Sequence, residues 1–249
     1  MTAVVEILNP DGRGRVVVIC EHATHYIPSE YNGLGLSEQD RKSHAAWDPG
    51  ARDVSLLLSA ALDAPMISST VSRLVYDCNR PPEAPCAMPE KSERIDVPGN
   101  IGLSQTDRDA RTHAIYDPFC AAVSKVLDAR GPDTIIVTMH SFTPIYHGKP
   151  RVVELGLLHD DDSRLVDAML SYADTLPHRR IERNAPYGPE DGVTHSLKIH
   201  AQSRGLANVM VEVRNDLLKT EKGIATMAQE LLILLRAALQ NDIKMEDAI

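Results

Sequence analysis

Short runs of β-branched and other apolar residues recur along the chain, and we expect each of them to form a buried strand. The clearest runs, dominated by Val, Ile and Met, lie at residues 15–20, 133–140 and 208–213. Continuous runs of this kind are typical of strands that are covered on both faces. Shorter strands are expected at residues 64–70, 72–77 and 151–158, and in a segment that begins at Arg180.

Segments with helical spacing separate these strands. One helix is expected to begin at Ser37, where Asp40 stands in a capping-box-like position, and a second has Asp48 and Pro49 at its head. Gly205 is placed to end one of the further helices, which are expected at residues 107–129, 163–173, 194–205 and 223–240. Strands that alternate with helices along the whole chain predict a three-layer α/β/α sandwich with a mainly parallel or mixed central sheet.

The chain contains no internal repeat and no segment that resembles a linker, so residues 1–249 are expected to form a single domain. The longest stretch without a period covers residues 78–105 and is rich in Pro and polar residues. Loops of this length inside a compact domain are usually functional or mobile. We therefore expect this loop to be able to close over a site.

Charge and composition exclude several classes of partner. The formal net charge is −9 and the chain has one Trp and two Phe, which argues against nucleic acid. No apolar stretch approaches the ~20 residues that cross a bilayer, and the N-terminal residues lack the pattern of a signal peptide. The four cysteines show no CxxC spacing and are expected to be free thiols. We expect a cytoplasmic protein that acts on a small molecule, in an oligomeric state that the sequence does not determine.

Three of the expected strands carry, at or near their carboxyl ends, a group that can bind metal or transfer a proton. These groups are His22, His140 and Glu212. Because ligands of open α/β sheets bind outside the carboxyl ends of the strands, the three side chains are expected to meet if their strands are neighbours. A lone histidine at a strand end is more often structural, so the prediction depends on the recurrence.

Zinc in a hydrolase takes three protein ligands and leaves one position for water. His22 and His140 supply two ligands, and the third is either Asp48 or Glu21. Asp48 is favoured because adjacent residues of a strand point in opposite directions, although an Asp before Pro49 is also a common helix N-cap.

Glu212 stands among Val and Met residues of a buried strand. A carboxylate in such a place is paired with a cation, bound to a metal or held for proton transfer. The plain alternative is a salt bridge to Arg214 or to another core arginine. General-base catalysis is the interpretation that agrees with the two histidines at the neighbouring strand ends.

A second polar cluster follows the expected strand at residues 72–77. Arg80 precedes two prolines, and with Asn79 it is expected to hold a substrate carboxylate, which the planar fork of arginine fits. Ser141 and Arg214 are expected to contribute to the same substrate site.

The other polar residues of these segments have plainer explanations. Arg73 and Asp77 are about as well explained by a structural ion pair, and Arg151 is a weaker candidate for the substrate carboxylate. His195 and His200 are expected to be surface or supporting histidines.

Taken in order, the segments CEHATHYIP, WDPGA, LVYDCNRP, MHSFTP and VMVEVRNDLL resemble the N-formylglutamate amidohydrolase family, over about residues 16–235. The resemblance implies a fold similar to that of zinc-dependent exopeptidases, with metal at the carboxyl edge of the sheet. It also implies an amide hydrolase that releases a small acyl group, formate in the family's named reaction, from an acidic amino acid. The last segment also resembles the strand that carries the catalytic glutamate of zinc amidases acting on muramoyl–alanine bonds.

One segment departs from the family pattern. The chain has Glu21-His22-Ala23-Thr24 where the histidine-degradation members have a Pro-His-Ser/Ala-Gly type of segment. His22 keeps its place, so the departure bears on the substrate more than on the metal chemistry. The sequence therefore looks like a side branch of the family.

These observations together predict a zinc-dependent amide hydrolase with one Zn²⁺ per chain, held by His22, Asp48 and His140. Glu212 is the expected general base, and the expected substrate is an N-acyl amino acid such as N-formyl-L-glutamate. Two alternatives stay open. One is a hydrolase like the cell-wall N-acetylmuramoyl-alanine amidases, and the other is a non-catalytic module that binds an acidic amino-acid derivative.

Overall fold

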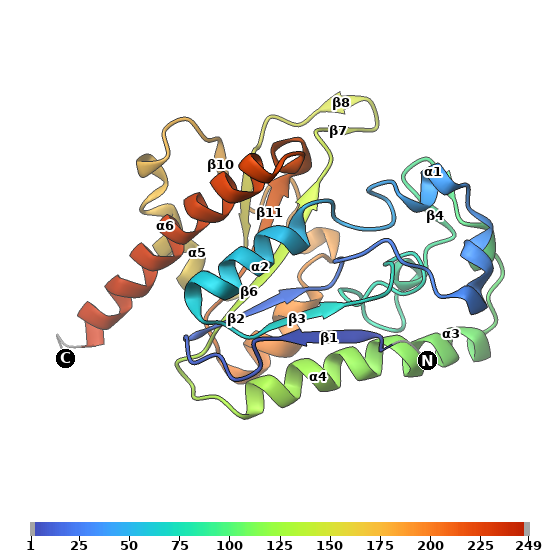
Figure 1. Ribbon diagram of the computed structural model, residues 1–249, viewed down its shortest axis with the longest axis horizontal. Helices are drawn as coiled ribbons and strands as arrows, with labels where there is room; N and C mark the ends of the chain where they lie inside the picture. The colour runs from blue at the N-terminus through green and yellow to red at the C-terminus, as the bar shows by residue number, and fades with distance from the viewer. Residues whose placement is uncertain (1–2, 247–249) are drawn as a thin grey trace.

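A seven-stranded mixed β-sheet forms the centre of the protein, which the computed structural model describes over residues 3–246 (Figure 1). Across the sheet the order is β1 (Val5–Leu8), β3 (Met66–Ser69), β2 (Val16–Cys20), β6 (Ile135–Phe142), β11 (Asn208–Arg214), β9 (Leu155–Leu158) and β10 (Ile181–Arg183). The four strands β3, β2, β6 and β11 are parallel, whereas β1 and β9 run antiparallel to their inner neighbours. The expected mixed sheet is confirmed; of the domain predicted for residues 1–249, residues 1–2 and 247–249 lie outside the described part.

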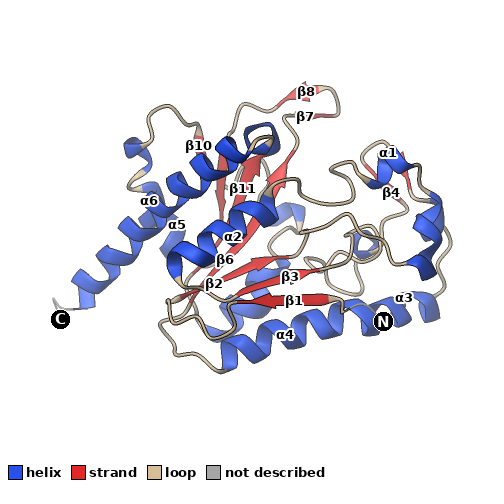
Figure 2. Ribbon diagram, in the orientation of Figure 1, coloured by secondary structure: helices blue, strands red, loops and turns tan. Residues whose placement is uncertain are grey.

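Helices cover both faces of this sheet (Figure 2). One face packs against α2 (Ala51–Leu62), α5 (Arg164–Leu170) and α6 (Glu221–Glu246), and the other packs against α4 (Asp117–Asp128), which follows α3 (Gln105–Arg111). Along β2, Val16 and Val18 belong to the first apolar core while Val17 and Ile19 belong to the second. Burial of each of these side chains stabilises the fold by about 1.5–3 kcal/mol. Because both faces of β2 are covered, the strand is apolar at every position.

The remaining elements are short and lie mostly in the loops. They are α1 (Glu38–Arg41), the hairpins β4 (Lys91–Ser92) with β5 (Ile95–Asp96) and β7 (Ile145–Tyr146) with β8 (Lys149–Pro150), two π-helical turns (Thr112–Tyr116 and Leu197–Ala201), and 3-10 turns at Ser29–Gly35, Pro85–Ala87, Pro98–Asn100, Ala173–Thr175, Pro189–Asp191, Gln202–Arg204 and Asn215–Leu218. No helix within residues 3–246 is long and apolar enough to cross a membrane.

The prediction of a strand at residues 72–77 is wrong. The backbone turns there, with the amide of Val75 donating to the carbonyl of Ser72 and the amide of Asp77 donating to the carbonyl of Ala87. Its apolar residues are buried all the same, because they fill the second core from an irregular segment. Burial without strand pairing gives the same sequence pattern as a short strand.

Other boundaries differ from the expected ones for local reasons. The helix expected at residues 107–129 begins earlier, because Ser104 and Asp107 form a capping box, and a π-helical turn separates α3 from α4. The helix expected at residues 194–205 is helical from residue 195 to 204, although it consists largely of a π-helical and a 3-10 turn, and Gly205 ends it with a positive φ of 69° as expected. Strand β1 was not expected, because it is a half-buried edge strand without a continuous apolar run.

The carboxyl ends of β2, β6 and β11 lie side by side in the middle of the sheet. Ile19 of β2 pairs with Thr138 of β6, and His140 of β6 pairs with Glu212 of β11. Residues just beyond the end of β2 therefore come level with His140 and Glu212. This register brings the expected functional residues to one edge of the sheet.

Candidate metal centre and active site

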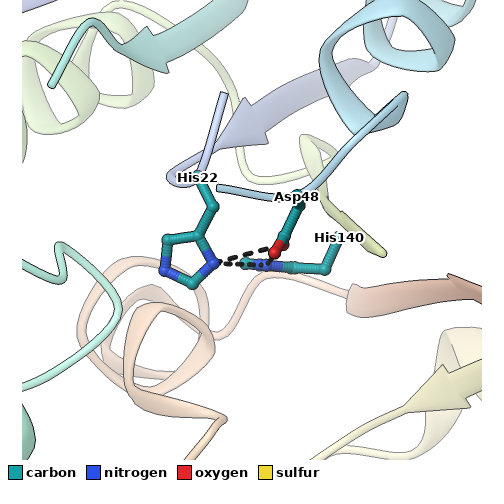
Figure 3. A group of neighbouring side chains, drawn as sticks. All are labelled: His22, Asp48 and His140. Atoms are coloured by element: carbon teal, nitrogen blue, oxygen red, sulfur yellow. Dashed lines mark hydrogen bonds and ion pairs between the residues drawn. The ribbon is translucent and has the colours of Figure 1, made fainter. Parts of the chain in front are cut away.

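Three buried donor atoms meet at this edge of the sheet (Figure 3). The Nδ1 atom of His22 lies 3.2 Å from Oδ2 of Asp48, and Nδ1 of His140 lies 3.0 Å from the same oxygen. The two Nδ1 atoms are 3.2 Å apart. We call these three atoms the donor triangle. It is made of the residues that the sequence predicts as metal ligands.

A backbone hydrogen bond of Asp48 holds this residue at the triangle. Its amide donates to the carbonyl of His22 at 3.0 Å, which ties the segment before α2 to the end of β2. The N-cap of α2 is Gly50, not Asp48, so the alternative role of Asp48 as a side-chain cap is wrong. Gly50 has a φ of 81°, and a Cβ atom there would lie 2.5 Å from Cβ of Leu218, so the turn requires glycine.

Each donor residue also has a partner on its outer side. Nε2 of His22 lies 2.7 Å from Oδ1 of Asp77, and Nε2 of His140 lies 3.2 Å from Oε2 of Glu21. Glu21 therefore contacts the His140 ring at the nitrogen that is not in the triangle, and Asp48 rather than Glu21 supplies the third donor atom.

The outer partner of Asp48 is Arg73. Its Nη1 donates to Oδ1 of Asp48 at 3.0 Å and lies 3.3 Å from Nδ1 of His22. The expected ion pair between Arg73 and Asp77 is not what the structure shows, because the guanidinium pairs with Asp48 while the carboxylate of Asp77 contacts the far nitrogen of His22.

The surrounding carboxylates control the protonation of the two histidines. Burial alone would lower the pKa of His22, but Asp77 and Asp48 outweigh this effect and raise it. Burial is likewise opposed at His140, where Glu21 and Asp48 raise the pKa well above its usual value. Both imidazoles thus stand in a strongly negative environment.

The charges of this region suit a divalent cation. Three buried carboxylates, Glu21, Asp48 and Asp77, face one guanidinium, that of Arg73. Unbalanced buried charge is costly, and this excess of two negative charges is balanced either by two protonated imidazoles or by one divalent cation bound to neutral imidazoles. In addition, a tetrahedral zinc ion with bonds of about 2.0–2.1 Å has its ligand atoms about 3.3 Å apart, close to the spacing of the triangle. The residues therefore fit zinc in both charge and donor geometry.

Glu212 lies beside the donor triangle without a matching cation. It pairs with His140 across the sheet and is 6% exposed, and its Oε2 has no hydrogen-bond partner among residues 3–246. Burial raises the pKa of Glu212 to about 7, and Asp48 adds to this effect while the histidines oppose it. The alternative of a salt bridge to Arg214 is wrong, because that arginine binds Asp216 and Glu154.

A cavity of about 300 Å³ opens next to the triangle, a size that suits a small molecule. His22, Asp48, His140 and Glu212 all line it. Its other lining residues come from several loops, including the expected loop at residues 78–105, and they include His44, Arg73, Asn79, Arg80, Lys91, Glu93, Ser141, Tyr146 and Tyr187.

Of the four residues predicted to bind substrate, the structure brings three to this cavity. Arg80 lines it, with Nη1 held by the carbonyls of Asn79 and Gly192. The side chain of Asn79 is occupied by the backbone of residues 193 and 196, and Ser141 donates to the carbonyl of Pro49. Arg214 is not among the lining residues.

Several lining residues have no signal in the sequence. His44, Glu93 and Tyr146 come from loops and short hairpins, where neither period nor strand position indicates which way a side chain points. His195 contacts the hydroxyl of Tyr116 at 2.7 Å, and neither His195 nor His200 lines the cavity.

The fold and the site together define an α/β enzyme with a metal-type donor set at the carboxyl edge of its sheet. The N-formylglutamate amidohydrolase family model matches residues 14–219, most of the chain. The chain therefore belongs to the N-formylglutamate amidohydrolase family, and it is a hydrolase that acts on amide bonds.

Two solved structures share the fold of this chain. The gene product Atu2144 from Agrobacterium tumefaciens is 51% identical, with a TM-score of 0.93 over 96% of this chain and 95% of that one. N-formylglutamate amidohydrolase from Ralstonia eutropha JMP134 is 18% identical, with a TM-score of 0.70 over 96% and 98% of the two chains. The latter likeness concerns the fold alone. A comparison with curated proteins found no match.

Proposed function

We propose that this protein is a zinc-dependent amide hydrolase that removes a small acyl group, formyl first of all, from an N-acyl amino acid such as N-formyl-L-glutamate. The observation that carries the proposal is the buried Glu212, which forms no ion pair within residues 3–246 and lies beside the donor triangle at the wall of a small cavity. A purely binding module has no use for a buried acid with a pKa near neutrality.

The metal would be held by His22, Asp48 and His140, one ion per chain. When bound, a divalent ion such as Zn²⁺ supplies a Lewis acid that polarises an amide carbonyl and makes water more acidic. Family membership and the donor set support this part of the proposal.

Glu212 is the proposed general base and acid. A carboxylate whose pKa is about 7 is half ionised at neutral pH, so it can take a proton from the attacking water and give it back. It would return that proton to the departing amine nitrogen, so that the carboxylate is regenerated and formate and the free amino acid leave. Its place opposite His140 in the sheet fixes it beside the donor triangle.

Arg80 is the proposed partner of the substrate carboxylate. Among the cations that line the cavity, Arg73 pairs with Asp48 and Lys91 pairs with Asp96, whereas Arg80 contacts only main-chain carbonyls in the described part of the chain. Arg80 acts electrostatically on Asp77 but forms no ion pair with it, so its guanidinium is available for an anionic ligand. Asn79 and Ser141 would support the adjoining walls of the cavity.

The proposal is tested by hydrolysis assays on protein that is stripped of metal and then reloaded with zinc. We expect formate release from N-formyl-L-glutamate that depends on the added zinc. Absence of formate release from any N-formyl amino acid would contradict the proposal. Cleavage of a muramoyl–alanine bond instead would favour the cell-wall amidase alternative, and ligand binding without turnover would favour the binding module.

A further inference from the structure

The residues that contact the donor triangle from outside form a set of their own. We propose that Glu21, Asp77 and Arg73 are positioning residues that orient the three candidate ligands toward one point. The inference rests on the proposed metal centre, and it assigns a role to residues that supply no donor atom to the triangle.

The two histidines are held in the same way. In each ring Nδ1 belongs to the triangle, while Nε2 faces a carboxylate, Asp77 at 2.7 Å from His22 and Glu21 at 3.2 Å from His140. A carboxylate that accepts the Nε2 proton fixes the neutral tautomer in which Nδ1 carries the lone pair. The contact with Asp77 is a hydrogen bond, whereas Glu21 lies at ion-pair distance from Nε2 of His140 without hydrogen-bond geometry. Both carboxylates favour the same tautomer, in which the Nδ1 lone pairs point into the triangle, where Nη1 of Arg73 also lies 3.3 Å from Nδ1 of His22.

Arg73 has the matching role at Asp48. Its Nη1 donates to Oδ1 of Asp48, while Nε and Nη2 donate to the carbonyls of Ala45 at 3.0 Å and His44 at 2.5 Å. The guanidinium thus ties the outer oxygen of Asp48 to the backbone a few residues earlier. Only Oδ2 remains for the triangle, so Asp48 presents one oxygen rather than two.

The local chain explains how these contacts arise. Glu21 and His22 are adjacent at the end of β2 and point in different directions, so that one side chain enters the triangle and the other lies against His140. Arg73 and Asp77 both come from the irregular segment at residues 72–77.

If these buried pairs only stabilised the fold, their loss would lower the free energy of unfolding without a specific effect on metal binding. Zinc affinity separates these two roles. The zinc dissociation constant of metal-free protein is measured by competition with a chromophoric chelator for the wild type, Glu21→Gln and Asp77→Asn. We expect zinc to bind about 10–100-fold more weakly to each variant, the usual effect of losing an outer partner of a ligand. The matched control is Glu230→Gln. Glu230 is also buried and ion-paired, with Arg179 and His178, but it does not contact the triangle.

Cobalt substitution gives a second measurement that fold stability does not affect. The visible absorption of bound Co²⁺ depends on the ligand geometry, so Glu21→Gln, Asp77→Asn and Arg73→Lys should change it and Glu230→Gln should not. Because the three positions act on three different ligands, a variant that fails to fold leaves the other two to decide. Zinc affinities and cobalt spectra equal to those of the wild type would overturn the proposal.

This experiment does not depend on turnover. Weaker zinc binding in the variants without hydrolysis by the wild type would contradict the proposed function and leave the positioning role intact. Normal hydrolysis by the wild type together with unchanged zinc affinity in the variants would contradict the positioning role and leave the proposed function intact. A wild-type protein that binds no zinc would overturn both.

Discussion

Glu212 differs from the other buried carboxylates near the site in its contacts. Glu21 and Asp77 each face a histidine, and Asp48 faces two histidines and Arg73. These contacts outweigh burial and lower the pKa of each of the three carboxyls, whereas burial prevails at Glu212 and raises its pKa. One acid among four is therefore suited to gain and lose a proton near neutral pH.

Replacing Glu212 with Gln should remove the proton transfer and leave the metal in place. We expect kcat to fall by about 10²–10⁴-fold, the usual contribution of a general base, with wild-type zinc content. The measurement is formate release under saturating substrate, with metal content determined on the same sample. Activity near that of the wild type would rule out Glu212 as the base.

Arg80 and Arg214 offer a matched pair, because only the first lines the cavity. Arg80→Ala should raise KM about 10–100-fold with little change in kcat, since a hydrogen bond to a charged group contributes about 1.5–3 kcal/mol. Arg214→Ala should leave KM unchanged. If steady-state kinetics showed a raised KM for Arg214→Ala and an unchanged KM for Arg80→Ala, Arg214 rather than Arg80 would bind the substrate carboxylate.

The donor residues could be predicted from the sequence because strand ends carry information about position. His140 ends an apolar run and His22 follows one, so that parallel neighbouring strands must bring them to one edge. The outer contacts of Arg73 and Asp77 could not be predicted, because side-chain direction in an irregular segment follows from tertiary packing. The same limit explains why Arg214 was expected at the cavity, although its side chain points to Asp216.

At the scale of elements, the short connection from residue 44 to α2 decides where Asp48 lies. Gly50 turns the chain into the helix with a positive φ, and Leu218 occupies the space that a Cβ atom at this position would need. The buried strands β2, β6 and β11 could be predicted from their continuous apolar runs. Segment 72–77 misled the prediction because its three apolar residues enter a core without pairing in the sheet.

Gly50→Ala should therefore destabilise the protein more than a positive φ alone would. Gly102→Ala is the control, because Gly102 has a φ of 67° and nothing within 4 Å of an added Cβ atom. Both variants carry the strain of a positive φ, and the contact with Leu218 should add about 1–3 kcal/mol for Gly50→Ala. Equal free energies of unfolding in denaturant titrations would contradict this account of the turn.

At the scale of the whole molecule, the sheet contributes one face to each of two large apolar cores, which the helices complete. His200 lies buried in the short turns after residue 194, outside the cavity. Burial lowers the pKa of His200 to about 4. An unfolded histidine has a pKa of about 6.5, so the unfolded chain binds the proton first as the pH falls.

This shift gives the stability of the fold a defined pH dependence. The contribution of His200 is fully present above pH 6.5 and is lost between pH 6.5 and about 4, by up to about 3 kcal/mol. His200→Gln should flatten the loss of stability over this range, whereas His147→Gln, at an exposed position, should not. Denaturant titrations between pH 7 and 4 measure the slopes, and equal slopes for wild type and His200→Gln would contradict the prediction.

The metal content of the protein purified without chelator tests the central claim most directly. Mass spectrometry should find about one zinc per chain in the wild type and almost none in His140→Ala, which should stay folded because only one of the three donor residues is replaced. Wild-type protein that carries no zinc and takes none up would contradict the metal centre. Full zinc occupancy in His140→Ala would show that the ion is bound elsewhere.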